Sequence, residues 1–324
     1  MKQTKNNVEQ GNKAHVDIPG NPSTATSSKQ KLNDRTNGKP FRVLSEDAWK
    51  FWKENGYVVV KNAVPLDQAK ATAGFLWEFD EKDPNDKSTW YAAPRAEMQM
   101  KELTGTGMVE VYNHQHLWNN RQTQKVYDAF VDVWGTEKLW VTIDRASLNF
   151  PLPEGVDKKG FIHWDYDPET KPQNVQGVLA LADQEDENMG GFQCIPWLYR
   201  NYDSWKLTQP NDRDRFQPSL KGLEDKIVKV KMNAGDLLIF NSTEPHGIRP
   251  NKSKDKVRIA QYISMMPAEP ENQALKNWRI NSWKNRVAPE GFAFPGDPRK
   301  WEQTKFETAK LSPLGEKLLG LKDW

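Results

Sequence analysis

Apolar and polar residues alternate in short segments between residues 108 and 267, and this pattern predicts β-strands. In IVKVKM, Val228, Val230 and Met232 would face one side of a strand and two lysines the other, which is typical of a half-buried strand. Comparable segments are MVEVY, LWVTIDRASLNF, VQGVLALA, GGFQCIPW, DLLIF and VRIAQYISM. Gly, Pro, Asn and Asp separate them, which favours an antiparallel sandwich or barrel over alternating strand–helix units.

Helices are predicted on both sides of this region. Ser45 is a good N-cap for a first helix that ends at Gly56, the strand YVVVKNA follows, and Pro65 begins a second helix. Another helix is predicted over residues 121–134, and the chain turns helical again after Pro267. The expected fold class is therefore mainly β with flanking helices.

Composition divides the chain into three parts. Residues 1–40 are rich in Asn, Lys, Ser, Thr and Gly and have few large apolar residues, so we expect a disordered tail. Residues 41–270 would form the β domain with its N-terminal helices. Residues 271–324 would form a C-terminal helical extension packed on the same domain.

Charge and cysteine content remove several function classes. The formal net charge is only +2, with no sustained basic run, which argues against nucleic-acid binding. Cys194 is the single cysteine, so an intramolecular disulfide and a thiolate zinc site are excluded. No apolar run approaches the ~20 residues of a membrane span, and no signal-peptide core is present. We expect a cytoplasmic protein that acts on a small molecule; the sequence does not indicate an oligomeric state.

A histidine and an aspartate stand two residues apart in FIHWDYDPET, at His163 and Asp165. On a strand both side chains project from one face, while Trp164 points away. Two histidines and one carboxylate form the ligand set of non-haem Fe(II) oxygenases and leave three positions for a chelating cosubstrate and O₂. The pair alone is a weak signal, so a third ligand is required.

The segment GDLLIFNSTEPHGIRPNKSKDKVRIAQY supplies a candidate third ligand, His246, just after an apolar strand. Arg258 lies in the next strand, and a hairpin would bring it back beside His246. A guanidinium pairs with both oxygens of a carboxylate, and the carboxylate we expect is the distal one of 2-oxoglutarate. Taken singly, His246 could be a turn histidine and Arg258 part of a structural ion pair; their order after the first pair favours the metal site.

A rival histidine pair occurs in YNHQHLW, at His114 and His116. A cupin metal site would place a glutamate three or four residues after the second histidine, where Asn120 and Arg121 stand instead. We therefore expect these histidines to line the substrate cavity or to lie on a solvated loop.

Several of these segments together resemble the phytanoyl-CoA dioxygenase family of Fe(II)/2-oxoglutarate oxygenases, which includes ectoine hydroxylase. The segments are HWD, ENMGGFQCIPW, GDLLIFNSTEPHG and FWKENGYVVVKNAVPLDQAKA, and the likeness covers roughly residues 45–267. The resemblance implies a double-stranded β-helix, which is a cupin-like jelly roll flanked by helices. It also implies Fe(II), 2-oxoglutarate and O₂ as reaction partners, with ascorbate as a reductant in vitro.

Carried over by position, the resemblance implies that His163, Asp165 and His246 bind iron and that Arg258 binds 2-oxoglutarate. Asn149, in DRASLNFPLP, matches a position that often holds 2-oxoglutarate, and Arg145 lies near it as a second cosubstrate-binding candidate or a structural ion-pair partner. Two departures concern the family's PGSH motif, which is PWLY at residues 196–199, and a supporting polar residue, which is Ile248.

The function expected on these grounds is oxidation of an unactivated C–H bond of a small metabolite, with release of succinate and CO₂. Related halogenases lack the carboxylate ligand, so Asp165 favours hydroxylation, desaturation or ring closure over chlorination. The alternatives are a non-catalytic jelly-roll binding protein that retains a metal site and a cupin-like metal isomerase. The segment 88–107 has the polarity and glycines of a cavity lid, in which Tyr91 and Arg95 are candidate substrate contacts.

Overall fold

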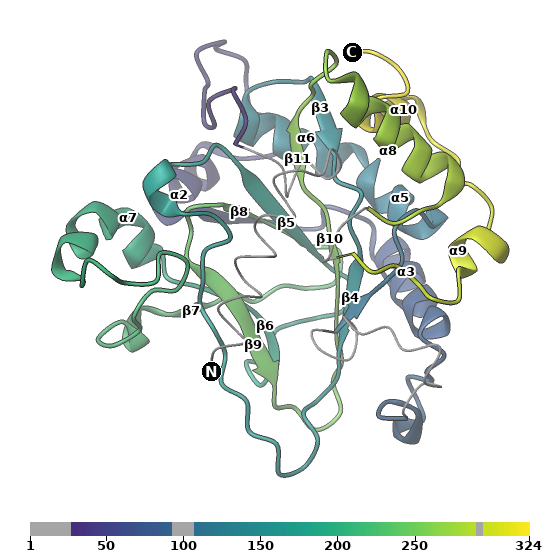
Figure 1. Ribbon diagram of the computed structural model, residues 1–324, viewed down its shortest axis with the longest axis horizontal. Helices are drawn as coiled ribbons and strands as arrows, with labels where there is room; N and C mark the ends of the chain where they lie inside the picture. Colours follow the sequence, from purple (N-terminus) through teal and green to yellow (C-terminus); the bar gives the residue numbers. More distant parts are fainter. Residues whose placement is uncertain (1–26, 93–106, 290–293) are drawn as a thin grey trace.

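Two antiparallel sheets lie face to face at the centre of the protein, and helices cover the larger one (Figure 1). The computed structural model describes residues 27–92, 107–289 and 294–324. The larger sheet has six strands in the order β1-β8-β5-β10-β4-β2. Their bounds, in that order, are Tyr57–Val60, Leu237–Asn241, Val175–Ala180, Arg258–Tyr262, Ala146–Asn149 and Met108–Val109.

The smaller sheet has the order β7-β6-β9, with bounds Val228–Lys229, Met189–Cys194 and His246–Asn251. Side chains of both sheets meet in one apolar cluster, which includes Val178 of β5 and Phe192 of β6. Because the two faces interdigitate around a shared interior, the mainly β jelly roll predicted from the alternating segments is confirmed.

Helices pack on the outer face of the larger sheet. Leu179 of β5 and Ile239 of β8 point away from the interior and join a core cluster with Leu76 and Phe130. Those two residues belong to α3 (Leu66–Phe79) and α6 (Gln124–Trp134). The other helices are α2 (Glu46–Asn55), α5 (Gln115–Arg121), α7 (Pro196–Trp205), α8 (Gln273–Asn285), α9 (Trp301–Thr304) and α10 (Pro313–Leu319). Short 3-10 turns are η1 (Lys87–Thr89), η3 (Pro168–Thr170), η4 (Lys206–Thr208) and η5 (Glu224–Lys226).

The first predicted helix is confirmed at both of its ends. The Ser45 side chain accepts a hydrogen bond from the Ala48 amide at 3.1 Å, and Gly56 ends α2 in the left-handed region with φ 72°. The strand β1 and the helix α3 then follow in the predicted order.

Two long segments that the sequence predicts as single strands are divided in the structure. LWVTIDRASLNF gives β3 (Leu139–Val141) and β4, and VRIAQYISM gives β10 and β11 (Met265–Pro267). β4 and β10 pair within the larger sheet, whereas β3 and β11 pair with each other in a separate two-stranded sheet. Each segment therefore passes from one sheet to the other part-way along its length. An alternation of apolar and polar residues alone does not reveal this change. The helix predicted over 121–134 is confirmed as α6 over residues 124–134, and a separate short helix, α5, ends at Arg121.

The segment PWLY forms the first turn of α7, with Pro196 at the start of the helix, where its missing amide donor costs nothing. In Figure 1 this helix projects to the left of the sheets. Leu198 and Trp205 of α7 pack in a small separate cluster with Ile162 and Trp164. The insertion between β6 and β7 therefore packs directly on the HWD segment.

The ends of the described chain are attached to this core. Residues 27–40, expected within a disordered tail, lie on the domain: Leu32 is buried, and the Trp52 indole donates to the Asn33 side chain at 2.6 Å. Residues 1–26 lie outside the described ranges. At the other end, Arg279 of α8 donates to the carbonyl of Val141 at 2.6 Å and to that of Leu319 at 3.0 Å.

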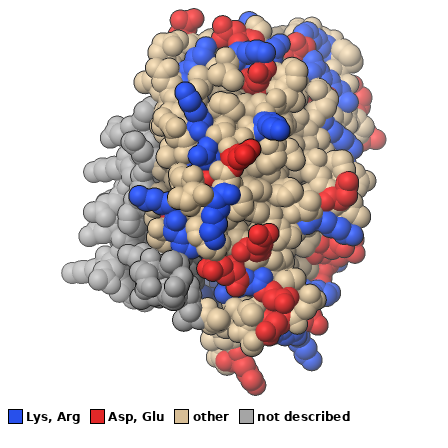
Figure 2. Space-filling model, turned by 90° about the vertical axis from the view of Figure 1, so that its right-hand side faces the viewer, with Lys and Arg blue, Asp and Glu red and all other residues tan. Residues whose placement is uncertain are grey.

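The surface is of mixed charge on the face shown in Figure 2, where Lys and Arg side chains are interspersed with Asp and Glu. Among the described residues, no helix combines the length and the hydrophobicity needed to cross a membrane.

Candidate metal centre

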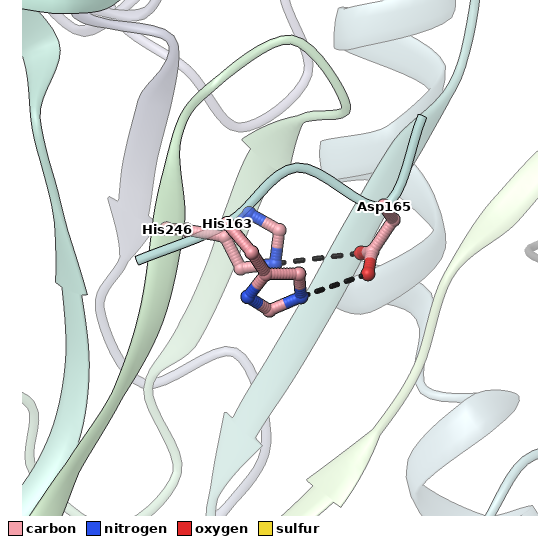
Figure 3. Close-up of side chains that lie close together, drawn as sticks. All are labelled: His163, Asp165 and His246. Carbon is pink, nitrogen blue, oxygen red and sulfur yellow. Dashed lines mark hydrogen bonds and ion pairs between the residues drawn. The ribbon is translucent and has the colours of Figure 1, made fainter. Parts of the chain in front are cut away.

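Three potential metal ligands converge between the two sheets (Figure 3). His163 and Asp165 lie on the segment that precedes β5, and His246 begins β9. The His163 Nε2 atom lies 3.0 Å from Oδ1 of Asp165, and the His246 Nε2 atom lies 3.4 Å from Oδ2. All three ligand atoms lie within 4.8 Å of one another, so one ion can contact all of them.

The main chain brings the two histidines together. The His163 amide donates to the His246 carbonyl at 2.8 Å, and the His246 amide donates back to the His163 carbonyl at 3.0 Å. Gly247 permits this approach, because a Cβ atom there would lie 1.8 Å from the Phe161 carbonyl oxygen. The predicted meeting of two distant parts of the chain therefore depends on a close backbone contact at a glycine.

Trp164 points away from the two ligands that flank it, as the strand geometry predicts. Its amide donates to the Phe216 carbonyl at 2.8 Å, and its indole donates to the Thr243 carbonyl at 3.0 Å. The ring is buried in the α7 cluster beside Trp205. These contacts anchor the ligand segment on the side opposite the metal.

The charges of the cluster suit a cation. The His246 Nδ1 atom lies 3.0 Å from the Glu244 carbonyl, which can only accept, so this nitrogen carries a proton. In a neutral ring, Nε2 is then the atom that can bind a metal. Burial lowers the pKa of His163, but the hydrogen bond and charge of Asp165 outweigh this and raise it. Burial raises the pKa of Asp165, but hydrogen bonds from both histidines hold it well below its usual range. A carboxylate facing two imidazole nitrogens fits Fe(II).

Gln176 also reaches this cluster, and sequence reasoning missed it. Its side-chain amide donates to Oδ2 of Asp165 at 2.5 Å. Gln176 alternates with the buried Val178 and Ala180 along β5, so its side chain shares their face. A polar residue at an inward-facing position of an apolar strand was the signal in VQGVLALA that could have identified it.

Arg258 lies on β10 and is completely buried. Its Nη1 atom donates to the side-chain oxygen of Asn149 at 2.9 Å and contacts the Ser147 hydroxyl at 3.4 Å. Its Nε atom donates to the side-chain oxygen of Gln184 at 3.2 Å, and its Nη2 atom has no partner within the described ranges. These partners are all neutral. A buried cation with a vacant donor and only neutral hydrogen-bond partners matches an incoming carboxylate.

The comparison with known families gives this geometry a context. A model of the protein family described as Phytanoyl-CoA dioxygenase (PhyH) matches residues 52–260, which is more than half of the 324 residues. The chain belongs to the phytanoyl-CoA dioxygenase family. At the level of this family it is an Fe(II)/2-oxoglutarate-dependent dioxygenase.

Individual proteins resemble this chain in sequence or in fold. Ava biosynthesis cluster protein O from Aspergillus versicolor is 26% identical over 272 residues, which cover 76% of this chain and 84% of the relative. The solved structure of the hypothetical protein JW0805 from Escherichia coli has a TM-score of 0.61 at 17% identity and covers 86% of this chain and 81% of its own. GlcNAc Inducible Gene 2 from Candida albicans has a TM-score of 0.58 at 14% identity, with 87% and 77% covered. These two structural likenesses show the fold alone.

Arg145, the other cosubstrate candidate from the family resemblance, lies apart from the Arg258 group. Its Nη1 atom forms an ion pair with Glu110 at 2.6 Å, and Tyr112 donates to the same carboxylate. The guanidinium also lies 4.7 Å from the centre of the Phe294 ring. The structure thus places Arg145 in a buried ion pair, the alternative weighed above, whereas Asn149 contacts Arg258 directly.

The rival histidines of this dioxygenase-family chain pack among the helices. His114 stacks on Phe75 of α3 at 3.6 Å and meets Phe306 at 4.7 Å, and its Nδ1 atom caps α5 by accepting from the His116 amide. Burial and the neighbouring His116 lower the pKa of His114 to about 4. The expectation that the pair lines the substrate cavity or a solvated loop is replaced by a role in helix packing.

The predicted lid falls mostly outside the described residues, which exclude 93–106 and therefore Arg95. Tyr91 lies within them and is half exposed, and its hydroxyl donates to the Pro151 carbonyl at 2.9 Å.

Proposed function

We propose that this protein is an Fe(II)/2-oxoglutarate-dependent dioxygenase that hydroxylates, desaturates or cyclises a small metabolite at an unactivated C–H bond. One observation carries the proposal: His163, Asp165 and His246 converge on one point in a chain that also buries Arg258 without an anionic partner among the described residues. The first group suits a ferrous ion and the second suits the far carboxylate of a dicarboxylic acid.

Separate groups of residues would bind the metal and the cosubstrate. His163, Asp165 and His246 would hold the ion, each through one side-chain atom. Arg258 receives the distal carboxylate of 2-oxoglutarate through its free Nη2 atom, while Asn149 and Gln184 hold the guanidinium in place. When bound, iron supplies the oxidising chemistry that couples decarboxylation of 2-oxoglutarate to oxidation of the substrate.

Aromatic side chains exclude water from one side of the proposed centre. The His246 ring stacks on Phe192 with ring centres 5.7 Å apart, and it lies 4.4 Å from the ring of Phe240. A dry wall strengthens the electrostatic interactions of the ligands and protects reactive species from side reactions.

The reaction type and substrate class rest on two further points. Asp165 is present as a carboxylate ligand, and in related halogenases that ligand is missing, so hydroxylation or a related oxidation is favoured over chlorination. The name of the Aspergillus relative assigns that protein to a biosynthesis cluster. This supports a small metabolite as the substrate here.

The direct test measures succinate from purified protein supplied with Fe(II), ascorbate and 2-oxoglutarate, with and without a metabolite extract. We expect succinate formation that the extract accelerates, together with a product that has gained one oxygen atom or lost two hydrogens. Asp165→Ala should abolish it, because the ion loses its only anionic ligand. Asp157→Ala is the matched control, since Asp157 pairs only with the exposed Lys252. Undiminished succinate in the Asp165→Ala variant would contradict the proposal.

A further inference from the structure

Gln176 is bonded to the candidate metal ligand Asp165 but is not itself a ligand in the proposed centre. Resting on the function proposed above, we propose that Gln176 is a positioning residue that holds the Asp165 carboxylate in its metal-binding orientation. It donates from its side-chain amide to Oδ2 of Asp165 at 2.5 Å. This is the only hydrogen bond that Asp165 receives from a described side chain other than the two histidines.

The two ends of this hydrogen bond differ in rigidity. Gln176 lies within β5, which pairs with β8 on one side and β10 on the other, and it stands directly opposite Phe240 in the register. Asp165 lies on a connection outside the named strands, and its side chain is 37% exposed. The bond therefore attaches a carboxylate on an irregular connection to a residue of the paired strand β5.

The outer partners of the three ligands are unequal. His246 is oriented by the Glu244 carbonyl, as described above, and Asp165 by Gln176. The Nδ1 atom of His163 is buried without a hydrogen-bond partner in the described part of the chain. Two of three ligands thus carry an orienting partner, and the partner of the carboxylate is a neutral donor, which restrains the anion and leaves its charge for the metal.

Removal of this donor should weaken metal binding without unfolding the protein. Gln176→Met keeps the length of the side chain and loses the amide, so Asp165 is freed to rotate. Loss of such an orienting partner typically costs about 10- to 100-fold in metal affinity. Gln261→Met is a matched control: Gln261 lies on β10 of the same sheet, is buried, and donates to the Leu117 carbonyl at 3.0 Å on the helix-covered face.

The experiment titrates the metal-free full-length protein with Co(II) and records affinity, the visible absorption spectrum and the thermal midpoint. We expect Gln176→Met to raise the Kd for Co(II) by about tenfold or more and to change the spectrum. Gln261→Met should lower the thermal midpoint and leave the Kd for Co(II) and the absorption spectrum unchanged. Wild-type affinity and spectrum in Gln176→Met, or equal weakening in both variants, would overturn the inference.

A third variant separates this inference from the proposed function. Asp165→Ala should lose tight Co(II) binding whatever Gln176 does. If wild-type protein binds Co(II), Asp165→Ala does not, and Gln176→Met behaves as wild type, then only the role of Gln176 fails. If Asp165→Ala binds Co(II) as tightly as wild type, the metal centre itself is wrong and both proposals fall.

Discussion

Arg258 is completely buried, and none of its hydrogen-bond partners among the described residues is an anion. Burial of an unpaired guanidinium is costly, and neutral acceptors such as the side chains of Asn149 and Gln184 offset only part of that cost. The residue is therefore poorly explained by stability. A dicarboxylate that supplies the missing negative charge explains it well.

Arg258→Met should weaken 2-oxoglutarate binding by on the order of 30-fold or more, since loss of one partner of a buried charge pair costs about 2 kcal/mol or more. The measurement is the Kd for 2-oxoglutarate of anaerobic, Co(II)-loaded protein. Arg279→Met is the control, because Arg279 is equally buried but donates to main-chain carbonyls of β3 and α10. It should lower stability and leave this Kd unchanged. Similar Kd values for Arg258→Met and wild type would refute the assignment.

At the residue scale, the sequence identified the site residues that stand at a recognisable spacing from one another. His163, Asp165, His246 and Arg258 could be proposed because the period of a strand and the length of a hairpin place them together. Gln184 and Glu110 carry no such spacing, because contacts made between distant parts of the chain leave no local pattern. Arg145 could not be assigned for the same reason, since its partner Glu110 lies 35 residues away in sequence.

Among the elements, β9 has the most direct influence on the candidate centre. It begins with His246, pairs with β6, and meets the HWD segment through Gly247. The space for a side chain at Gly247 is occupied by the Phe161 carbonyl. The distance between the two histidines therefore depends on Gly247, which has no side chain that could bind the metal.

Gly247→Ala should force β9 and residues 161–163 apart and thereby weaken Co(II) binding and lower the thermal midpoint. Gly74→Ala provides the same substitution without a clash, since nothing lies within 4 Å of a Cβ atom there. Gly74 is inside α3, so alanine should stabilise the protein by about 0.5–1 kcal/mol. Calorimetry and Co(II) titration of both variants check this. Tight Co(II) binding and an unchanged midpoint in Gly247→Ala would show that the backbone relaxes around the new methyl group.

At the element scale, the sequence predicted which helices and strands exist better than it predicted where they begin and end. Both ends of α2 were predicted, and α3 begins beside the proline that was predicted to start it, because a cap, a glycine and a proline mark these boundaries. The strand predictions over 139–150 and 257–265 ran through the point where the chain moves to another sheet, and alternation continues through such a bend. The strand predicted over GGFQCIPW ends at Cys194, because Pro196 begins the helix α7.

In the whole molecule, the helices over the larger sheet form a layer with titratable groups of its own. Burial against Phe75 and Phe306 favours the neutral form of His114; its titratable neighbour is His116, which itself lies near Glu78. An exposed histidine titrates near pH 6.5, whereas burial lowers the pKa of His114 to about 4. Protons therefore bind the unfolded chain first as the pH falls.

Because the pKa of His114 is lower in the folded protein than in the unfolded chain, the neutral residue contributes fully to the free energy of unfolding above about pH 6.5. This contribution is lost as the pH falls toward 4. We expect this residue to reduce the free energy of unfolding by about 1–2 kcal/mol between pH 7 and pH 5. His114→Asn keeps a helix cap and removes the titration, so its curve should be flatter. Urea unfolding in the presence of a chelator compares the two proteins. Parallel curves would exclude His114 as the source.

The reciprocal amide bonds between His163 and His246 have a practical consequence. The two protons involved can exchange with deuterated solvent only when the strands carrying the ligands separate, so their exchange rates report directly on the integrity of the centre. Mass spectrometry of the peptides that contain these amides can thus rank added metals and dicarboxylates by the protection they confer. Such a screen requires no turnover, and it can therefore begin before the natural substrate is identified.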